Sequence, residues 1–137
     1  MKKNNPIKIT SLLFFLMLFT NCETIMDCIS RIKPDLLSKE LYFGTVDKYY
    51  NDSVTFQMIR GNTDDYFISE VSIEGNLPPN IKYIENNKSV IFSGIPTTPG
   101  IYEFTVIITV QPYTYNSDGT DDLCGDVASK KYKIIIN

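Results

Sequence analysis

Polar and apolar residues alternate along most of the chain after residue 52. The longest such stretch is IYEFTVIITV at 101–110, where an apolar or aromatic residue occupies every second position. A period of two is typical of a β-strand that turns one face toward a core. The same alternation, over shorter lengths, marks five further segments: 52–60, 66–74, 81–85, 89–93 and 132–136.

Turn-forming residues separate these segments. The stretch GIPTTPG at 94–100 contains two prolines, which cannot donate a hydrogen bond within a sheet, so it is predicted to be a loop. Asn-Asn-Lys at 86–88 predicts a hairpin turn, and 111–126 is a polar loop. The alternation slips between Ile68 and Val71, which predicts a β-bulge or a strand break.

The first element of this pattern has two interpretations. Segment 36–50 fits a short helical turn followed by a strand, or one irregular strand bent at Gly44. With it, the chain has about seven short strands spaced by roughly 8–12 residues, which predicts an all-β antiparallel sandwich. A closed barrel is the alternative. The 137 residues suffice for one such domain, which is predicted at 35–137.

The N-terminus has the pattern of an export signal. Three lysines precede an uncharged, mostly apolar run at 9–20, which is too short to cross a bilayer as a helix. The run ends in LFTNC, which resembles the bacterial lipobox, a motif cut before a cysteine that carries lipid. We therefore predict a signal helix at 1–21, lipid on Cys22 and a tether at 22–34. The alternatives are an uncleaved N-terminal anchor and a buried helix.

Composition excludes several classes of function. The chain has no histidine, which removes Ser-His-Asp and Cys-His catalysis and all histidine-containing zinc sites. No activated nucleophile, metal site or cofactor motif is found, so we predict that the protein is not an enzyme and holds no cofactor. After residue 21 the chain has ten basic and 16 acidic residues, a net charge of −6. Such a balance predicts no nucleic-acid partner.

Two cysteines follow the predicted lipidation site. An even pair in an exported protein predicts one disulfide, between Cys28 and Cys124. Two free thiols, or a bridge between two molecules, are the alternatives.

The segment LPPNIKYIENNKSVIFSGIPTTPGIYEFTVIITV at 77–110 resembles the immunoglobulin-like, cadherin-like modules of bacterial surface and secreted proteins. The shared residues are Leu77-Pro78-Pro79, Ser93-Gly94, Pro96-Thr97-Thr98, Gly100, Tyr102, Phe104 and Val106. Asn80 replaces the usual glycine and tolerates the left-handed backbone that a turn there needs. The resemblance implies an immunoglobulin-like sandwich that acts as a spacer, a stalk or a binding surface.

The polar loop at 111–126 holds the candidate binding residues. Its carboxylates, Asp118, Asp121 and Asp122, raise the question of calcium. The loop does not have the D-x-[DN]-x-[DN]-G spacing and no Glu closes it, so a solvated hairpin is favoured. Tyr113 and Tyr115 belong to the same loop. Exposed tyrosines bind sugars or proteins, and clustered loops at one end of a sandwich form a binding surface. The alternative is that these rings cap the edge of the core.

These observations lead to one expected function and two alternatives. We expect a non-enzymatic lipoprotein of the bacterial cell envelope, held at the outer membrane by its lipid, with an immunoglobulin-like module for adhesion or envelope assembly. The sequence leaves open which leaflet holds the lipid. The alternatives are a periplasmic inhibitor or immunity-type protein that binds one protein partner, and a carbohydrate-binding accessory module. The ligand is therefore expected to be a protein or a glycan.

Overall fold

The computed structural model describes residues 31–137. The predicted signal segment, the lipidation site Cys22 and the cysteine Cys28 lie outside the described residues. Residues Ile32–Asn137 form one compact unit, the second unit of the chain, which holds all the strands described below. Among residues 31–137, no helix is long and apolar enough to cross a membrane.

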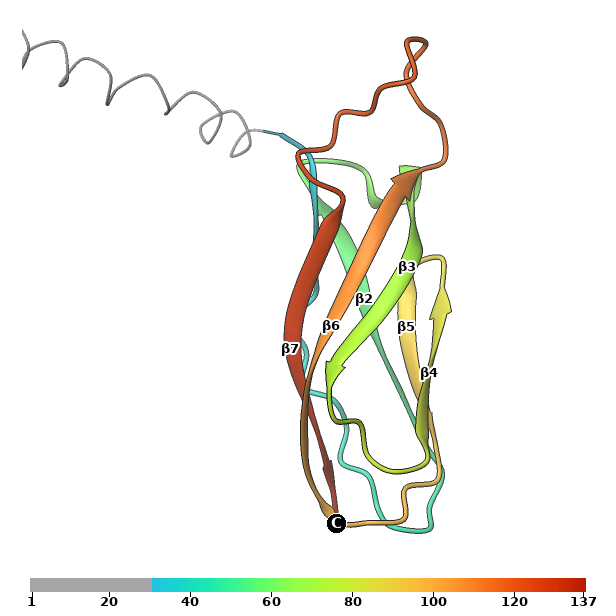
Figure 1. Ribbon diagram of the computed structural model, residues 1–137, viewed down its shortest axis with the longest axis vertical. Coiled ribbons are helices and arrows are strands. Elements are labelled where there is room, and N and C mark those ends of the chain that lie inside the picture. Colours follow the sequence, from blue (N-terminus) through green and yellow to red (C-terminus); the bar gives the residue numbers. More distant parts are fainter. Residues whose placement is uncertain (1–30) are drawn as a thin grey trace, which may run out of the picture. The chain divides into compact units, whose positions relative to one another are not determined.

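Seven strands and one 3₁₀ turn make up the second unit (Figure 1). They are β1 (Lys33–Leu36), β2 (Tyr50–Ile59), η1 (Thr63–Asp65), β3 (Tyr66–Gly75), β4 (Ile81–Asn86), β5 (Ser89–Gly94), β6 (Gly100–Pro112) and β7 (Val127–Ile136). The first strand begins within the segment that the sequence assigns to a tether.

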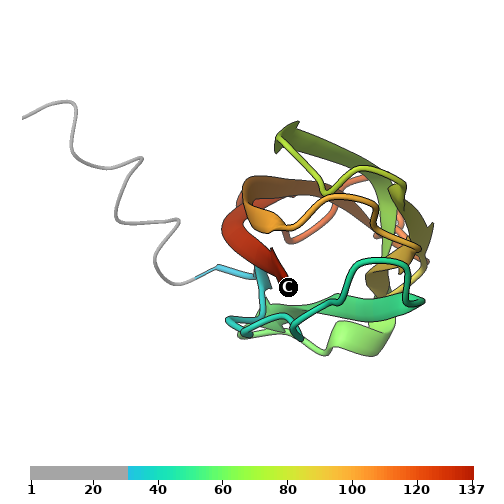
Figure 2. The ribbon, with the colours of Figure 1, turned by 90° about the horizontal axis from the view of Figure 1, so that it is seen from below.

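The strands form two antiparallel sheets, with the orders β1-β2-β5-β4 and β3-β6-β7. Viewed from one end, the sheets are two layers that face each other (Figure 2). This is the strand order of the seven-stranded immunoglobulin domain. The predicted all-β, immunoglobulin-like sandwich is therefore confirmed, and the closed-barrel alternative is wrong because the strands separate into two hydrogen-bonded sheets.

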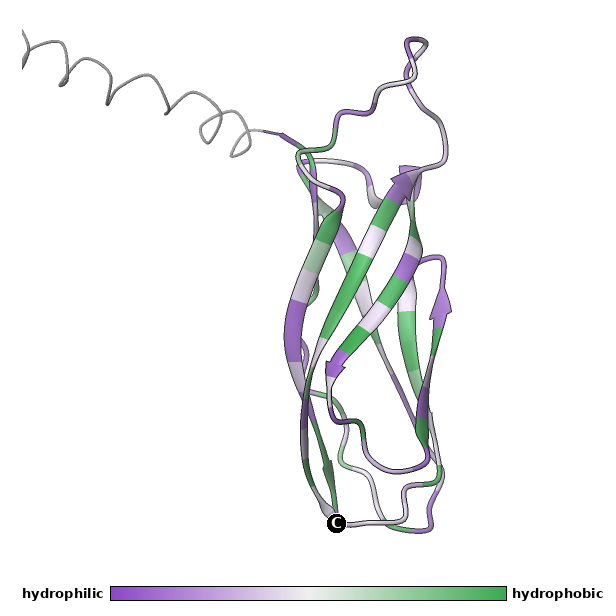
Figure 3. Cartoon of the chain, viewed as in Figure 1, coloured by the Kyte–Doolittle hydropathy of each residue, from purple (hydrophilic) through white to green (hydrophobic). Residues whose placement is uncertain are grey.

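Alternate side chains of the two sheets fill the space between the layers. On β6 the inward side chains, at every second position from Phe104 to Val110, are at most 3% exposed. The ring of Phe104 lies 5.2 Å from that of Phe92 on β5 and 6.4 Å from that of Tyr132 on β7. Bands of hydrophobic and hydrophilic residues alternate along β3 and β6 in Figure 3. The period of two in the sequence is thus the period of burial.

Local features that the sequence predicts are also present. The register between β3 and β6 shifts between Ile68 and Glu70, which is the predicted bulge. The turn at 86–88 joins β4 and β5 as a hairpin. Asn80 has a φ of +67°, so its backbone is left-handed, as the resemblance to glycine-containing relatives implies.

The chain crosses from one sheet to the other between β1 and β2. At Gly44 it pairs in parallel with Ile136 at the end of β7. The Gly44 N–H donates to the Ile135 carbonyl at 2.8 Å, and the Val46 N–H donates to the Asn137 carbonyl at 3.0 Å. A Cβ at Gly44 would lie 2.4 Å from Cδ1 of Ile136 and 3.1 Å from Cδ2 of Tyr50, so a larger residue there requires the Ile136 side chain to move. Segment 36–50 matches neither interpretation in full: residues 37–49 form an irregular connection between β1 and β2, with one β-bridge at Gly44 and no helical turn.

Side chains of β7 tie β1 to the other sheet. The Tyr132 hydroxyl donates to the Leu37 carbonyl at 2.7 Å. Lys130 Nζ donates to the Leu36 carbonyl and lies 3.1 Å from a carboxylate oxygen of Asp35. Burial, assisted by the negative charge of Asp35, raises the pKa of Tyr132 to about 12. These bonds give the carbonyls of Leu36 and Leu37, at and just after the end of β1, donors from the opposite sheet.

A tyrosine fixes the entry to β6. The Tyr102 hydroxyl donates to the Thr98 carbonyl four residues upstream, at 3.1 Å. The same hydrogen bond, called the tyrosine corner, occurs in immunoglobulin-like folds. In antibody domains the tyrosine of this corner lies two residues before the second cysteine of the conserved disulfide. Phe104 stands at that cysteine position, so an aromatic ring replaces a disulfide at the centre of this sandwich.

We expect Tyr102→Phe to lower the free energy of unfolding by about 1 kcal/mol, because it removes one hydrogen bond and little else. Urea unfolding followed by circular dichroism measures this difference. Tyr49→Phe is the matched control, because that ring is 70% exposed. Equal stability of the two variants would contradict the role of the corner.

Candidate binding surfaces

The two ends of the sandwich hold different parts of the chain. One end, here called the loop end, consists of segments 60–65, 87–88 and 113–126. Backbone hydrogen bonds of 2.9 Å join them: the Tyr113 N–H donates to the Asp65 carbonyl, and the Ile68 N–H donates to the Asn87 carbonyl. The C-terminus lies at the opposite end (Figure 1). Three connections therefore meet at this end, and their role as a binding surface stays a prediction.

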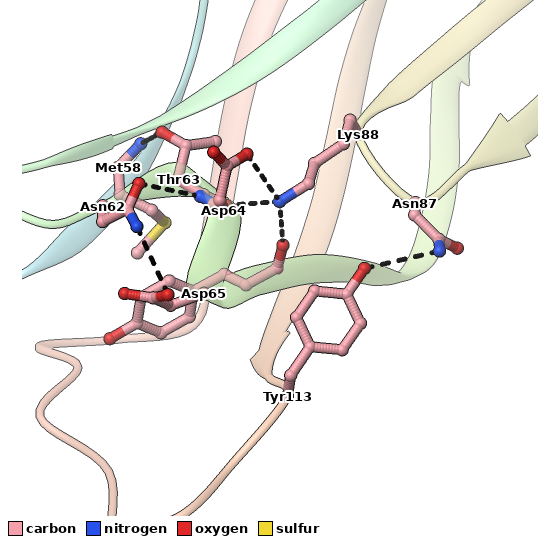
Figure 4. A network of polar contacts seen from close by, with 9 residues as sticks. Met58, Asn62, Thr63, Asp64, Asp65, Asn87, Lys88 and Tyr113 are labelled. Atoms are coloured by element: carbon pink, nitrogen blue, oxygen red, sulfur yellow. Dashed lines mark hydrogen bonds and ion pairs between the residues drawn. The ribbon is translucent and has the colours of Figure 1, made fainter.

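Lys88 is the centre of the contacts within the loop end (Figure 4). Its Nζ donates to the carbonyls of Thr63 and Tyr66, the latter at 2.6 Å, and lies 3.8 Å from a carboxylate oxygen of Asp64. The same ammonium group lies 5.6 Å from the centre of the Tyr113 ring, within the range of a cation–π contact. One lysine thus connects the hairpin β4–β5 to the connection β2–β3 and to the end of β6.

The two candidate tyrosines have different environments. The Tyr113 ring packs on Phe67, with 4.9 Å between ring centres, and its hydroxyl accepts a hydrogen bond from Nδ2 of Asn87 at 3.4 Å. Tyr115 is 53% exposed. Tyr113 therefore caps the end of β3, as the alternative for these rings expects, although half of its surface remains open to solvent.

The candidate carboxylates hold their own loop. Asp118 accepts hydrogen bonds from the hydroxyl of Thr120 at 2.6 Å and from its N–H at 3.0 Å. These bonds, that from the hydroxyl above all, lower the pKa of Asp118. Asp121 accepts from the N–H of Leu123 at 3.0 Å. Within residues 31–137, no group of three acidic or cysteine side chains could hold a metal ion. These contacts are those of a solvated hairpin loop.

The start of the described chain adjoins Cys124. Ile32 forms a β-bridge with Leu123, and the Cys124 N–H donates to the Ile32 carbonyl at 2.8 Å. Cys28 precedes Ile32 by four residues, and an extended chain spans about 3.5 Å per residue. Ile32 thus lies beside Cys124, while Cys28 lies outside the described residues, so the disulfide stays a prediction.

The outer face of the sheet β3-β6-β7 is another candidate surface, which the sequence does not predict. A groove of about 620 Å³ lies there, and the segment 39–43 forms one of its walls. Phe43 and Ile135 contribute apolar lining, while Glu103 and Lys133 contribute charge. From the sequence, these residues are recognisable only as outward-facing positions, each on a different segment. Their proximity follows from the strand register and from the crossing at Gly44.

A buried carboxylate positions that wall. Asp52, which is 6% exposed, accepts hydrogen bonds from the N–H of Tyr42 at 2.8 Å and from Lys39 Nζ. Burial, with the nearby charge of Asp52, raises the pKa of Tyr50 far above its usual range. Asp52 thus serves to hold segment 39–42 against β2, and its hydrogen-bonding capacity is largely used within the fold.

Comparisons with known proteins concern the fold alone. No protein-family model matches the sequence, and no curated protein sequence matches it. Among solved structures, the chain is similar to an endo-fucoidan hydrolase of glycoside hydrolase family 107, with 18% identity and a TM-score of 0.54. The similarity covers 83% of this chain and only 15% of the hydrolase. Titin domain M7 is similar with 11% identity and a TM-score of 0.46, over 78% of this chain and 96% of that domain.

We expect Lys88→Met to lower the free energy of unfolding by about 1–3 kcal/mol, because two carbonyls lose a charged donor while the apolar stem is kept. Urea unfolding tests this. Lys82→Met, on the exposed side of β4, is the control and should change the value by less than about 0.5 kcal/mol. A similar small change in both variants would show that Lys88 does not hold the loops together.

We expect Cys124→Ser to lower the free energy of unfolding by about 2–4 kcal/mol, since a bond to Cys28 closes nearly the whole domain into a loop. Thermal melting without reductant measures the loss. Adding reductant should lower the melting temperature of the wild type and leave the variant unchanged. A variant that melts at the wild-type temperature would contradict the disulfide.

Proposed function

We propose that this protein is a non-enzymatic, lipid-anchored module of the bacterial cell envelope that binds a protein partner through its immunoglobulin-like domain. The anchor is the lipid predicted on Cys22. Nine residues, 23–31, separate that cysteine from the compact unit that begins at Ile32. At about 3.5 Å per residue, the domain stays within about 35 Å of the lipid. A disulfide at Cys28 shortens this distance to about 20 Å.

The single observation that carries a binding role is the groove on the outer face of β3-β6-β7. Phe43 at its edge is 70% exposed, and the neighbouring Ile101 is 67% exposed. Large apolar side chains beside a groove, bordered by charged residues, are typical of protein interfaces. A spacer or stalk would not need this surface.

A protein partner suits this surface better than a glycan. Sugar-binding sites use aromatic rings as stacking platforms, and Phe43 is the one strongly exposed ring among the side chains that line this groove. Aliphatic side chains next to paired charges match the composition of protein interfaces. The similarity to part of a fucoidan hydrolase concerns the fold and adds nothing to the glycan alternative.

The non-enzymatic role is argued from the available side chains. Without histidine, a general base would have to be a carboxylate, lysine, tyrosine or cysteine with a pKa shifted toward neutrality, and carboxylates are the first candidates. The buried Asp52 is engaged by a lysine and by backbone N–H groups. Asp118 has a lowered pKa and belongs to an exposed turn. Neither carboxylate is placed to take a proton from a substrate.

We expect the native protein, purified from membranes of a bacterial host, to have the mass of a chain that begins at Cys22 and carries lipid. Intact mass spectrometry without reductant measures this directly. Cys22→Ala is the matched control and should accumulate without lipid. A full-length mass, or a cleaved chain without lipid, would contradict the anchor.

A further inference from the structure

The outer face of β3-β6-β7 carries one apolar row near the C-terminal end of β7. Ile101 on β6 is the cross-strand partner of Ile135 on β7. Gly44 pairs with Ile136 in parallel, so the preceding residue, Phe43, stands beside Ile135 on the same outward side. The row therefore runs Phe43, Ile135, Ile101 across three adjacent segments, and its two ends are about two-thirds exposed.

A charged row lies directly beside the apolar row. Glu103 on β6 is the cross-strand partner of Lys133 on β7, and both side chains are exposed. On the far side of Ile101 there is a second hollow, of about 580 Å³, which is lined in part by Leu77, Ile101 and Tyr102. The face thus has an exposed ring at one edge, a hollow at the other and an acid–base pair between them.

We infer that this face is the docking site for a second copy of the same chain. The argument is self-complementarity about a two-fold axis that runs parallel to the strands, midway between β6 and β7. Such an axis places β6 of each copy over β7 of the other and keeps every residue at its own level along the strands. Glu103 then faces Lys133 of the second copy, and Ile101 faces Ile135 of the second copy.

The same axis also accommodates Phe43. In each copy, the Phe43 ring lies one segment beyond β7. The rotation places the ring of one copy beyond β6 of the other copy, over the second hollow that Leu77 and Ile101 line in part. Each copy therefore inserts one ring into one hollow, and the contact forms twice. An aromatic side chain buried in a pocket at the edge of an apolar patch is a typical anchor of an interface.

The charges select this axis over the perpendicular one. An axis across the strands keeps each strand opposite its own copy, so Glu103 on β6 never meets Lys133 on β7. With that axis at the level of the charged row, Glu103 faces Glu103 and Lys133 faces Lys133. Like charges brought together at an interface are strongly unfavourable. The parallel dimer is thus the arrangement in which both rows are satisfied.

The parallel axis also gives both copies the same direction. Ile32 of each copy then lies at the same end of the dimer, because the axis leaves positions along the strands unchanged. If both copies carry lipid at Cys22, which rests on the proposed function, both anchors can enter one membrane. Two anchors on one particle hold it to the membrane more firmly than one anchor does.

The test is the oligomeric state of the full chain in detergent micelles, measured by sedimentation equilibrium over a wide range of protein concentration. We expect the wild type to form dimers. Glu103→Lys and Lys133→Glu should each weaken the dimer by about tenfold or more, since each places like charges opposite one another. An equimolar mixture of these two variants should form a mixed dimer, because one variant has two basic groups at these positions and the other has two acidic groups.

Two truncations complete the test. Phe43→Ala should weaken the dimer, whereas Ile84→Ala, which is 60% exposed on the other sheet, should not. A wild type that is monomeric at all concentrations overturns the proposal, as does a dimer that withstands both charge reversals or a mixture that fails to associate. Cys22→Ala should dimerise like the wild type, so that failure of the docking face and failure of the lipid anchor are separate results.

Discussion

The crossing of the chain at Gly44 is the constraint on which the rest of the structure depends. The first strand belongs to one sheet, and the backbone at Gly44 pairs with Ile136 of the other sheet so closely that a Cβ at Gly44 would displace the Ile136 side chain. This approach covers the free edge of β7 and turns Phe43 outward beside Ile135. Asp52 fixes the segment that leads to the crossing, through Tyr42 and Lys39. A single glycine therefore shapes both the closure of the core and the surface beside it.

The sequence predicts those parts of the fold that depend on local periodicity. Alternation locates the strands, and its slip after Ile68 locates the bulge, because both express which side chains are buried. The sequence does not locate the crossing at Gly44, since a single β-bridge has no period. Turn chemistry locates the loop that holds the candidate residues Tyr113, Tyr115, Asp118, Asp121 and Asp122. The row Phe43, Ile135, Ile101 could not be found, because three residues far apart in sequence meet only through long-range register.

The loop end and the outer sheet face differ in how they can serve the proposed lipid-anchored protein. Ile32 lies beside Leu123 at the loop end, so the proposed anchor at Cys22 would keep the loop end near the membrane. Loops in that position are hindered from meeting a large partner. The outer face of β3-β6-β7 runs along the side of the sandwich and stays accessible to a neighbour that stands upright beside it. The position of the tether therefore favours the side face as the binding surface.

Net charge and local charge act on association in opposite directions. The chain has a net charge of −3, so two copies repel one another at long range, although salt reduces this repulsion beyond a Debye length of about 8–10 Å. The pair of Glu103 and Lys133 acts at contact distance and favours one orientation over another. Apolar contact at Phe43, Ile101 and Ile135 supplies the attraction that salt does not weaken. Moderate salt screens the long-range repulsion and so speeds the encounter of two copies. It weakens the bound dimer less, because apolar contacts supply the affinity and the charge pairs supply mainly the orientation.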